Sequence, residues 1–238
     1  MFENTKIPLQ QWFIAIYLFT SHKKGISSHQ LAKDLNVTQK TAWFMTQRIR
    51  FVIQTETYEA FSGAVEVDET FVGGKNKNRH AHKKVANSQG RSFKDKTPVV
   101  GILSRDTKKV ICEVVADTKA GTIQPIILSN VEHGSTLHSD EWHGYTGLSK
   151  FYNHEVVNHN SKEYVKGNCY TNSIEGFWSL FKRGLFGIYH QVSKKHLQMY
   201  ADEFTFRYNH KDDTVNDNFD LFLQMSTTKR LTYEALIN

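Results

Sequence analysis

Hydrophobic positions near the start of the chain follow the period of an α-helix. Trp12, Ile16 and Phe19 lie three or four residues apart, which places them on one helical face. The apolar run from Trp12 to Phe19 is far shorter than the roughly 20 residues that a membrane span requires. We interpret this run as a buried helix, and we expect neither a membrane span nor a signal peptide.

Two short helices with separate caps are predicted between residues 27 and 50. Ser27 or Ser28 can cap the first helix, and Thr38 can cap the second. Asn36 lies between them and tolerates a turn with positive φ. This spacing is typical of a helix-turn-helix that reads DNA, and a plain two-helix hairpin is the alternative. The side chains expected to face a DNA groove are Gln39, Lys40 and Trp43.

Beyond residue 63 the pattern changes to the period of β-strands. Residues 64–72 alternate between apolar and polar side chains, as in a strand with two different faces. Four further strands are predicted at 98–104, 109–115, 135–140 and 155–159, with a helix at 123–131. Strands interleaved with helices indicate an α/β domain with a mixed sheet.

The chain returns to helical spacing at residues 171–210. One helix begins at Asn172 or Ser173, and Ser193 is expected to cap a second helix. We therefore predict three parts: a helical module at 1–58, an α/β domain at 63–211 and a C-terminal tail at 212–238.

The composition excludes several classes of protein. With 39% hydrophobic residues among 238, the chain has ample material for a core and is not a disordered protein. Cys112 and Cys169 are its only cysteines, which excludes a disulfide framework and a cysteine-based zinc ribbon. A reducing, cytoplasmic setting fits this content.

Positive charge gathers in two segments of the chain, whose formal net charge is +6. Residues 74–97 hold eight basic side chains against one acidic, and residues 1–58 hold seven against three. Such clusters favour a polyanion such as nucleic acid, although an ordinary solvated surface has the same pattern. The lysines expected to contact DNA phosphates whatever the base sequence are Lys75, Lys77, Lys83 and Lys84.

Three acidic residues stand where a sheet and a helix would bring them together. Asp68 lies within the first predicted strand, Asp140 ends a later one, and Glu175 lies in the first turn of a helix. Two divalent cations about 4 Å apart can activate water and stabilise a leaving oxygen in phosphodiester chemistry. Carboxylates are the ligands that Mg²⁺ and Mn²⁺ prefer, so these acids predict a two-metal site. Lys182 falls about 20° from Glu175 around the helix and could contact a substrate phosphate.

Each acid also has an ordinary structural interpretation. Asp68 could be an exposed strand residue, and Asp140 could be a turn residue. The stretch from Asn172 to Glu175 matches a capping box, in which the glutamate reaches back to the start of the helix. Capping is the better interpretation of Glu175 taken singly, whereas the three acids taken together with a DNA-reading module favour catalysis.

Three stretches of the chain resemble the bacterial insertion-sequence transposases of the DDE superfamily. They begin at Val65, Ser139 and Asn172, and they read VEVDETFVGGK, SDEWHGY and NSIEGFWSLFKRG. Seventy-one residues separate Asp68 from Asp140, and 34 separate Asp140 from Glu175. The upstream helix-turn-helix residues also resemble those proteins, and the likeness runs from residue 2 to about residue 211.

The resemblance implies both a fold and an activity. The fold is an RNase-H-like mixed sheet flanked by helices, preceded by an all-α helix-turn-helix module. The activity is DNA strand cleavage at element ends and strand transfer into target DNA, with two Mg²⁺ or Mn²⁺ ions bound by Asp68, Asp140 and Glu175. Lys182 and its neighbour Arg183 would then contact DNA. Asn172 is an alternative third metal ligand.

The resemblance further implies double-stranded DNA as partner, a homodimer in the active complex and a location at the bacterial nucleoid. Members of this branch usually carry a Cys-rich zinc ribbon before the helix-turn-helix, and this sequence shows none. That departure bears on the binding of element ends. Two alternatives stay open: an inactive or truncated DNA-binding remnant or repressor, and a metal-dependent nuclease without strand transfer.

Two other chemistries have weaker support in the sequence. His138, Asp140 and His143 could form a zinc hydrolase site, but their spacing is not that of catalytic zinc sites. Tyr145 or Tyr170 could be the nucleophile of a tyrosine recombinase, but only Arg183 lies near enough in sequence to clamp a phosphate.

Overall fold

The chain forms two compact units, each described here by itself. The computed structural model describes residues 1–2, 5–54, 58–73, 80–86, 92, 95–157, 171–226 and 231–237. One unit comprises Met1–Tyr58 and Leu180–Asn238, and the other comprises Glu59–Ser179. No helix in these ranges is long and apolar enough to cross a membrane.

A five-stranded sheet organises the unit of residues 59–179. Its strands are β1 (Ala64–Val72), β2 (Thr97–Ser104), β3 (Val110–Val114), β4 (Thr136–Asp140) and β5 (Asn153–Val157). The spatial order is β3-β2-β1-β4-β5. β1, β2 and β3 pair antiparallel, whereas β4 runs parallel to β1 and β5 runs parallel to β4. The predicted mixed α/β class, which the resemblance described as RNase-H-like, is confirmed.

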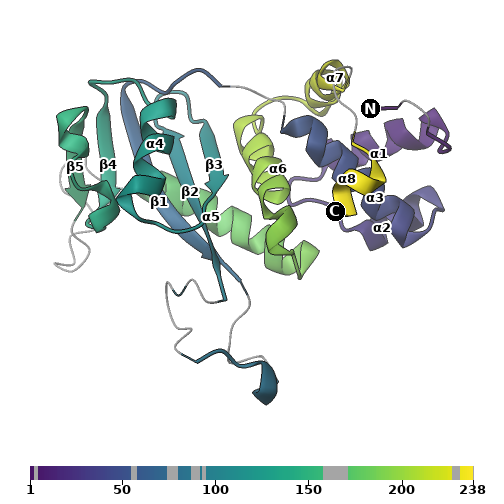
Figure 1. The fold of residues 1–238 in the computed structure, drawn as a ribbon. Helices are drawn as coiled ribbons and strands as arrows, with labels where there is room; N and C mark the ends of the chain where they lie inside the picture. Colours follow the sequence, from purple (N-terminus) through teal and green to yellow (C-terminus); the bar gives the residue numbers. More distant parts are fainter. Residues whose placement is uncertain are drawn as a thin grey trace. The chain divides into compact units, whose positions relative to one another are not determined.

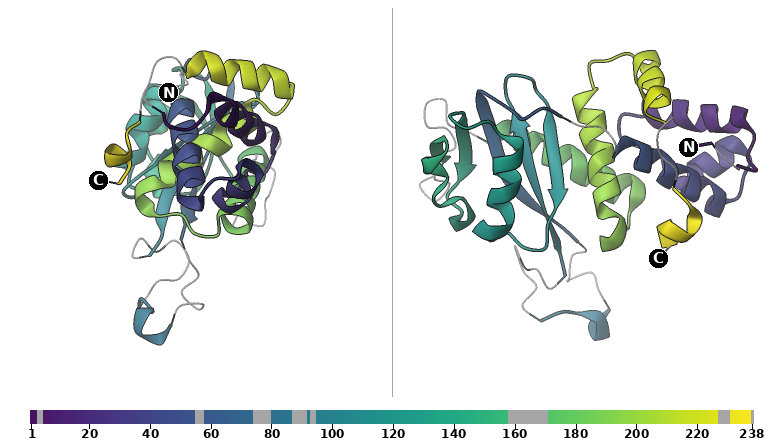
Figure 2. Two further views of the ribbon diagram at one scale, coloured as in Figure 1. Left: turned by 90° about the vertical axis from the view of Figure 1, so that its right-hand side faces the viewer. Right: turned by 45° about the horizontal axis from the view of Figure 1, so that its top comes forward.

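Helices cover both faces of this sheet (Figures 1 and 2). On one face, Val65 and Val67 of β1 join Ile123 and Ile127 of α4 (Ala120–Asn130) in a hydrophobic cluster. The other face receives the start of α5 (Asn172–Gly184). Because side chains alternate along a strand, Val65 and Val67 contribute to the core on one face, and Glu66 and Asp68 face α5 on the other.

The strand and helix boundaries differ slightly from the sequence prediction. β5 begins at Asn153, two residues before the predicted start, and α4 begins at Ala120. Short 3₁₀ turns also occur within this unit, at Ala81–Lys83, His143–Tyr145 and Leu148–Lys150. The connection from the last strand to α5 lies outside the described residues.

The second unit is helical. Its helices are α1 (Leu9–Ser21), α2 (Ser28–Leu35), α3 (Gln39–Ile53), α6 (Leu197–Asn209), α7 (Val215–Met225) and α8 (Tyr233–Ile237). The predicted caps of the helix-turn-helix are present, since the Ser27 side chain accepts from the Gln30 N–H and the Thr38 side chain accepts from the Thr41 N–H. Asn36 adopts the left-handed conformation between α2 and α3, at φ 52°.

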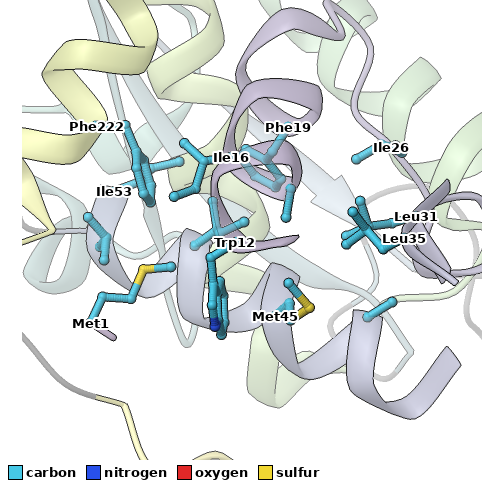
Figure 3. Packing of buried hydrophobic residues seen from close by; sticks show 14 of the residues in the cluster. Met1, Trp12, Ile16, Phe19, Ile26, Leu31, Leu35, Met45, Ile53 and Phe222 are labelled. Atoms are coloured by element: carbon cyan, nitrogen blue, oxygen red, sulfur yellow. The ribbon is translucent and has the colours of Figure 1, made fainter. Parts of the chain in front are cut away.

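Three expectations for the C-terminal part are wrong. The predicted tail contains α7, whose Phe222 is fully buried among α1 and α3 side chains such as Ile16 (Figure 3). Residues 180–211 likewise belong to the helical unit and not to the α/β unit. Ser193 makes no capping hydrogen bond, because a 3₁₀ turn at Lys194–His196 precedes α6. A π-helical turn, Leu185–Tyr189, follows α5.

Candidate active site

Acidic side chains occupy one face of two neighbouring parallel strands. Glu66 of β1 is in register with His138 of β4. Asp68 and Asp140 each lie two residues farther along their strands, and two residues return a side chain to the same face. Asp68, in the middle of β1, and Asp140, the last residue of β4, therefore lie on the same face of neighbouring strands.

The start of α5 lies over this face and is attached to it by two hydrogen bonds. The backbone N–H of Ile174 donates to Glu66 Oε2 at 2.9 Å. One turn later, the indole N–H of Trp178 donates to Asp68 Oδ2 at 3.0 Å. Glu175 follows Ile174 directly, so these contacts bring the third acid of the predicted set to the same side of the sheet.

A glycine makes room for the helix. Gly101 of β2 is in register with Asp68, and a Cβ atom built there would lie 2.6 Å from the Trp178 ring. Such an approach is shorter than two carbon atoms tolerate, so any larger residue would displace the indole. The absence of a side chain at Gly101 therefore lets Trp178 reach Asp68.

The electrostatics of Asp68 show that the three acids interact. Burial, and then the charges of Glu69, Asp140 and Glu175, raise the pKa of Asp68 from 3.8 to about 7, against a lowering hydrogen bond from the Glu69 N–H. Like charges disfavour the ionised form only when they lie close together. The charges of Asp140 and Glu175 thus reach Asp68, and the grouping of the three acids into one metal site stays a prediction.

Each of the other two acids also makes a local hydrogen bond. Asp140 is partly exposed, and its Oδ1 accepts from the Trp142 N–H at 3.0 Å, which is the turn role considered from sequence. Glu175 is exposed, and its Oε1 accepts from the Thr171 hydroxyl at 3.3 Å. The carboxylate that accepts the first-turn N–H of Ile174 belongs to Glu66. Exposed oxygens at Asp140 and Glu175 can therefore meet a ligand.

Comparison with known proteins shows the family of the chain. Residues 60–209 match the model of the ISXO2-like transposase domain, which is more than half of the chain. The chain belongs to this transposase family. Its acids at positions 68, 140 and 175 all lie within the matched residues.

Relatives of the transposase occur in an archaeon and in a bacterium. It is 27% identical over 218 residues to an uncharacterised protein in transposable element ISH50 of Halobacterium salinarum, covering 87% of this chain and 72% of that one. It is 28% identical over 130 residues to an uncharacterised transposase-like protein of Haemophilus influenzae, covering 54% and 98%. A solved Mos1 transposase paired-end complex shares 15% identity at a TM-score of 0.34, covering 95% of this chain and 82% of that one.

The acids of the transposase are hard oxygen donors, as Mg²⁺ and Mn²⁺ require, and their mutual repulsion is the kind that bound cations relieve. Among the described residues, no three His, Cys, Asp or Glu side chains form a group that could hold a metal ion as they stand. The carboxylate oxygens are thus of the kind that divalent cations prefer as ligands. In this structure, however, the three carboxylates do not form a complete set of metal ligands.

The zinc and tyrosine alternatives find no support among the described residues. His138 Nε2 lies 3.2 Å from Arg105 Nη1, and burial followed by the Arg105 charge lowers the pKa of this imidazole. The Tyr145 hydroxyl is buried and donates to Glu69 Oε2 at 2.6 Å. Burial and the Glu69 charge raise the pKa of Tyr145 well above its ordinary value, which makes it a poor nucleophile. Tyr170 lies outside the described residues.

The side chains of α3 predicted to face DNA have different environments. Gln39 is exposed and donates to the Ser28 hydroxyl at 2.8 Å. Lys40 is exposed, with its ammonium 5.2 Å from the ring centroid of Tyr233 in α8. Trp43 is half-buried against the His196 ring, at 5.8 Å between centroids. Gln39 and Lys40 therefore remain the more accessible of the three.

The remaining basic candidates are only partly covered by the structure. Lys75 and Lys77 lie outside the described residues, and of Lys83 only the backbone is described, in a 3₁₀ turn. Lys84 is exposed. Lys182 is half-buried and Arg183 is exposed, both in the last turn of α5.

Sequence reasoning missed Glu66, which is fully buried on the same face as Asp68. Its Oε1 accepts from Arg105 Nε at 2.7 Å. Only the alternation of β1 hinted at it, because Glu66, Asp68 and Thr70 share a polar face. The arginine partner is 39 residues away in the chain, so no local pattern could identify it.

Proposed function

We propose that this transposase cleaves a DNA strand at the element end and joins the freed 3′-hydroxyl to target DNA. The observation that carries the proposal is the convergence of Asp68, Asp140 and Glu175 on one face of the sheet, expressed in the pKa of about 7 for Asp68. Acids that repel one another in a partly open site are typical of catalytic positions and seldom of structural ones.

Two divalent cations fit the three acids as cofactors. When bound, Mg²⁺ or Mn²⁺ would supply an activated oxygen nucleophile and charge stabilisation for the leaving oxygen. Asp68 and Asp140, which lie on adjacent strands, would hold both cations, and Glu175 would complete the coordination of one. Trp178 orients the Asp68 carboxylate by its N–H at 3.0 Å. Lys182, seven residues after Glu175 on α5, would contact a DNA phosphate.

A strand-transfer assay with a labelled duplex of the element end and Mg²⁺ tests the proposal. Asp68→Ala, Asp140→Ala and Glu175→Ala should each abolish joined product. Glu113→Gln is the matched control, because it removes one exposed acidic charge from β3 of the same sheet. If all three triad variants retain activity, the proposal is wrong.

The same assay separates the two alternative functions. Nicked DNA without joined ends would identify a metal-dependent nuclease. A gel shift without Mn²⁺ binding and without nicking would identify an inactive DNA-binding protein.

We further propose that α3 and the basic loop predicted at residues 74–97 bind double-stranded DNA. Replacing Lys83 and Lys84 by alanine should weaken binding equally across base sequences and reduce the slope of log affinity against log salt by up to about 2. Binding measured at several salt concentrations gives the slope. An unchanged slope would show that the loop does not contact DNA. Because two element ends must meet, we expect a homodimer on DNA, which light scattering would detect.

A further inference from the structure

Glu66 has an environment unlike that of the other carboxylates on its face. Its side chain is completely buried, and each of its two oxygens has a donor. Arg105 Nε lies 2.7 Å from Oε1, and the Ile174 N–H lies 2.9 Å from Oε2. Glu66 is completely buried against these two donors, whereas Asp68 is half-buried, so the roles of the two acids differ.

The partner at Oε2 explains why an acid is placed there. Ile174 is the third residue of α5, and its N–H is among those that a helix leaves without an internal acceptor. A carboxylate at this end of a helix also interacts favourably with the helix dipole. Glu66 therefore caps α5 from a strand 108 positions away in the chain.

This cap fixes the residue that follows it. Glu175 comes directly after Ile174, so its backbone position is set by the bond to Glu66. The second attachment, from Trp178 to Asp68, lies one turn farther along and fixes the rotation of the helix about its axis. Arg105 keeps the Glu66 side chain itself in place, through an ion pair and a contact with His138.

We propose that Glu66 is a positioning residue, which holds the first turn of α5 against the sheet and so places Glu175 beside Asp68 and Asp140. This inference rests on the proposed catalytic function. Glu66 touches neither substrate nor cation in this account, and it acts only through the helix that it caps.

Glu66→Gln tests the inference, because the amide keeps the size of the side chain but opposes one of its two donors with an NH₂ group. We expect Mn²⁺ affinity of the DNA-free protein, measured by electron paramagnetic resonance of the free ion, to fall about tenfold. We expect kcat for strand cleavage to fall about a hundredfold, as for a misplaced catalytic group, while KM for DNA stays unchanged.

Val65→Ala is the matched control. Val65 is the preceding residue of β1, is equally buried and faces the opposite side of the sheet. It should lower Tm at least as much as Glu66→Gln, yet leave Mn²⁺ affinity and kcat near the wild-type values. Equal losses of affinity and kcat in both variants would show that Glu66 is merely structural and would overturn the inference.

Two further variants keep the test decisive. If Glu66→Gln does not fold, Arg105→Lys loosens the same carboxylate by offering an ammonium in place of the guanidinium fork, and should lower Mn²⁺ affinity a fewfold. Unchanged affinity in that variant would also overturn the inference. Asp68→Asn distinguishes a failure of the proposed function from a failure of the inference about Glu66. If Asp68→Asn cleaves DNA normally, the proposed function is wrong. If Asp68→Asn is inactive while Glu66→Gln cleaves normally, only the inference about Glu66 is wrong.

Discussion

Glu203 of the helical unit and Asp68 of the sheet unit have opposite electrostatic environments. In the helical unit, Glu203 is completely buried, and Arg50 and Arg207 each approach it to 2.7 Å. Burial alone would raise the pKa of Glu203, but the charges of the two arginines lower it below the ordinary value. The Tyr189 hydroxyl also donates to this carboxylate. The two arginine charges thus offset the burial of the Glu203 carboxylate.

On the sheet, Asp68 has acidic neighbours in place of arginines, and its pKa rises to about 7. The difference teaches how to separate a structural acid from a functional one. A buried acid whose charge is fully compensated ties helices together, as Glu203 ties α3 to α6. A buried acid surrounded by its own kind costs stability and is kept for what it binds.

The largest expected effect comes from removing the charge of Asp68. Asp68→Asn should lower the strand-cleavage rate by about a thousandfold or more, because in the proposed mechanism Asp68 is a metal ligand that stabilises the transition state. The same change should raise Tm of the metal-free protein at pH 8 by a few degrees, since it removes like-charge repulsion. Thermal melts with a chelator present measure the second effect.

The sign of the pH dependence sharpens this prediction. Because the folded-state pKa of about 7 exceeds the ordinary 3.8, ionised Asp68 destabilises the fold increasingly as pH rises from about 4 to 7. The Tm advantage of Asp68→Asn should therefore be complete above pH 7 and disappear near pH 4. If Asp68→Asn were less stable than wild type at pH 8, the charge of Asp68 would not be destabilising, and Asp68 would not differ from Glu203 in this respect.

Removing the charge of Glu203 should have the opposite effect on stability. Glu203→Gln leaves two arginines buried without their counter-ion, and breaking such a cluster costs about 3–5 kcal/mol. Since the pKa of Glu203 is lowered, its contribution is present above the ordinary value and is lost as pH falls. Urea unfolding at pH 7 measures the loss, and exposed Glu132→Gln is the control. Wild-type stability in Glu203→Gln would contradict the assignment of this cluster as structural.

Filling the space at Gly101 should disturb the functional acid through its hydrogen-bond partner. Gly101→Ala would place a methyl group 2.6 Å from the Trp178 ring, and such overpacking costs about 1–3 kcal/mol. We expect lower Tm and slower cleavage. Gly121→Ala is the matched control, because a methyl group there meets nothing within 4 Å and helix α4 gains a better helix former. Equal behaviour of the two variants would exclude a special role for Gly101.

The smallest expected effect concerns the Trp178 hydrogen bond itself. Trp178→Phe keeps an aromatic ring on the sheet but removes the N–H that stabilises ionised Asp68. A hydrogen bond to a charged group contributes about 1.5 kcal/mol, so the pKa of Asp68 should rise by about one unit. The acidic limb of the pH–rate profile should move upward by that amount. A profile that does not move would show that the indole only packs.

Local chemistry explains what could be predicted from the sequence. Ser27, Asn36 and Thr38 act within their own turns, so their caps were visible in a few residues. The alternation of residues 64–72 placed Asp68 on a polar face of β1, and the position of Asp140 at a strand end placed it beside that face. The acids could therefore be grouped before any coordinates were known.

Distant partners explain what the sequence could not show. Arg50 binds Glu203 across 153 positions, and Glu66 caps α5 across 108. Phe222 of α7 is buried because α1 and α3 offer it an apolar surface from the other end of the chain. Patterns within a short window of sequence contain no information on such pairings. For this reason the sequence predicts a tail where α7 lies, and places residues 180–211 in the wrong unit.

The repulsion around Asp68 has a consequence for the history of mobile elements. On the proposed function, a copy that loses this carboxylate by mutation would lose its chemistry, but its protein would fold at least as firmly as before. Quality control by cellular proteases would then not remove it. Decayed copies could persist in a genome as abundant proteins that occupy element ends and compete with their active siblings.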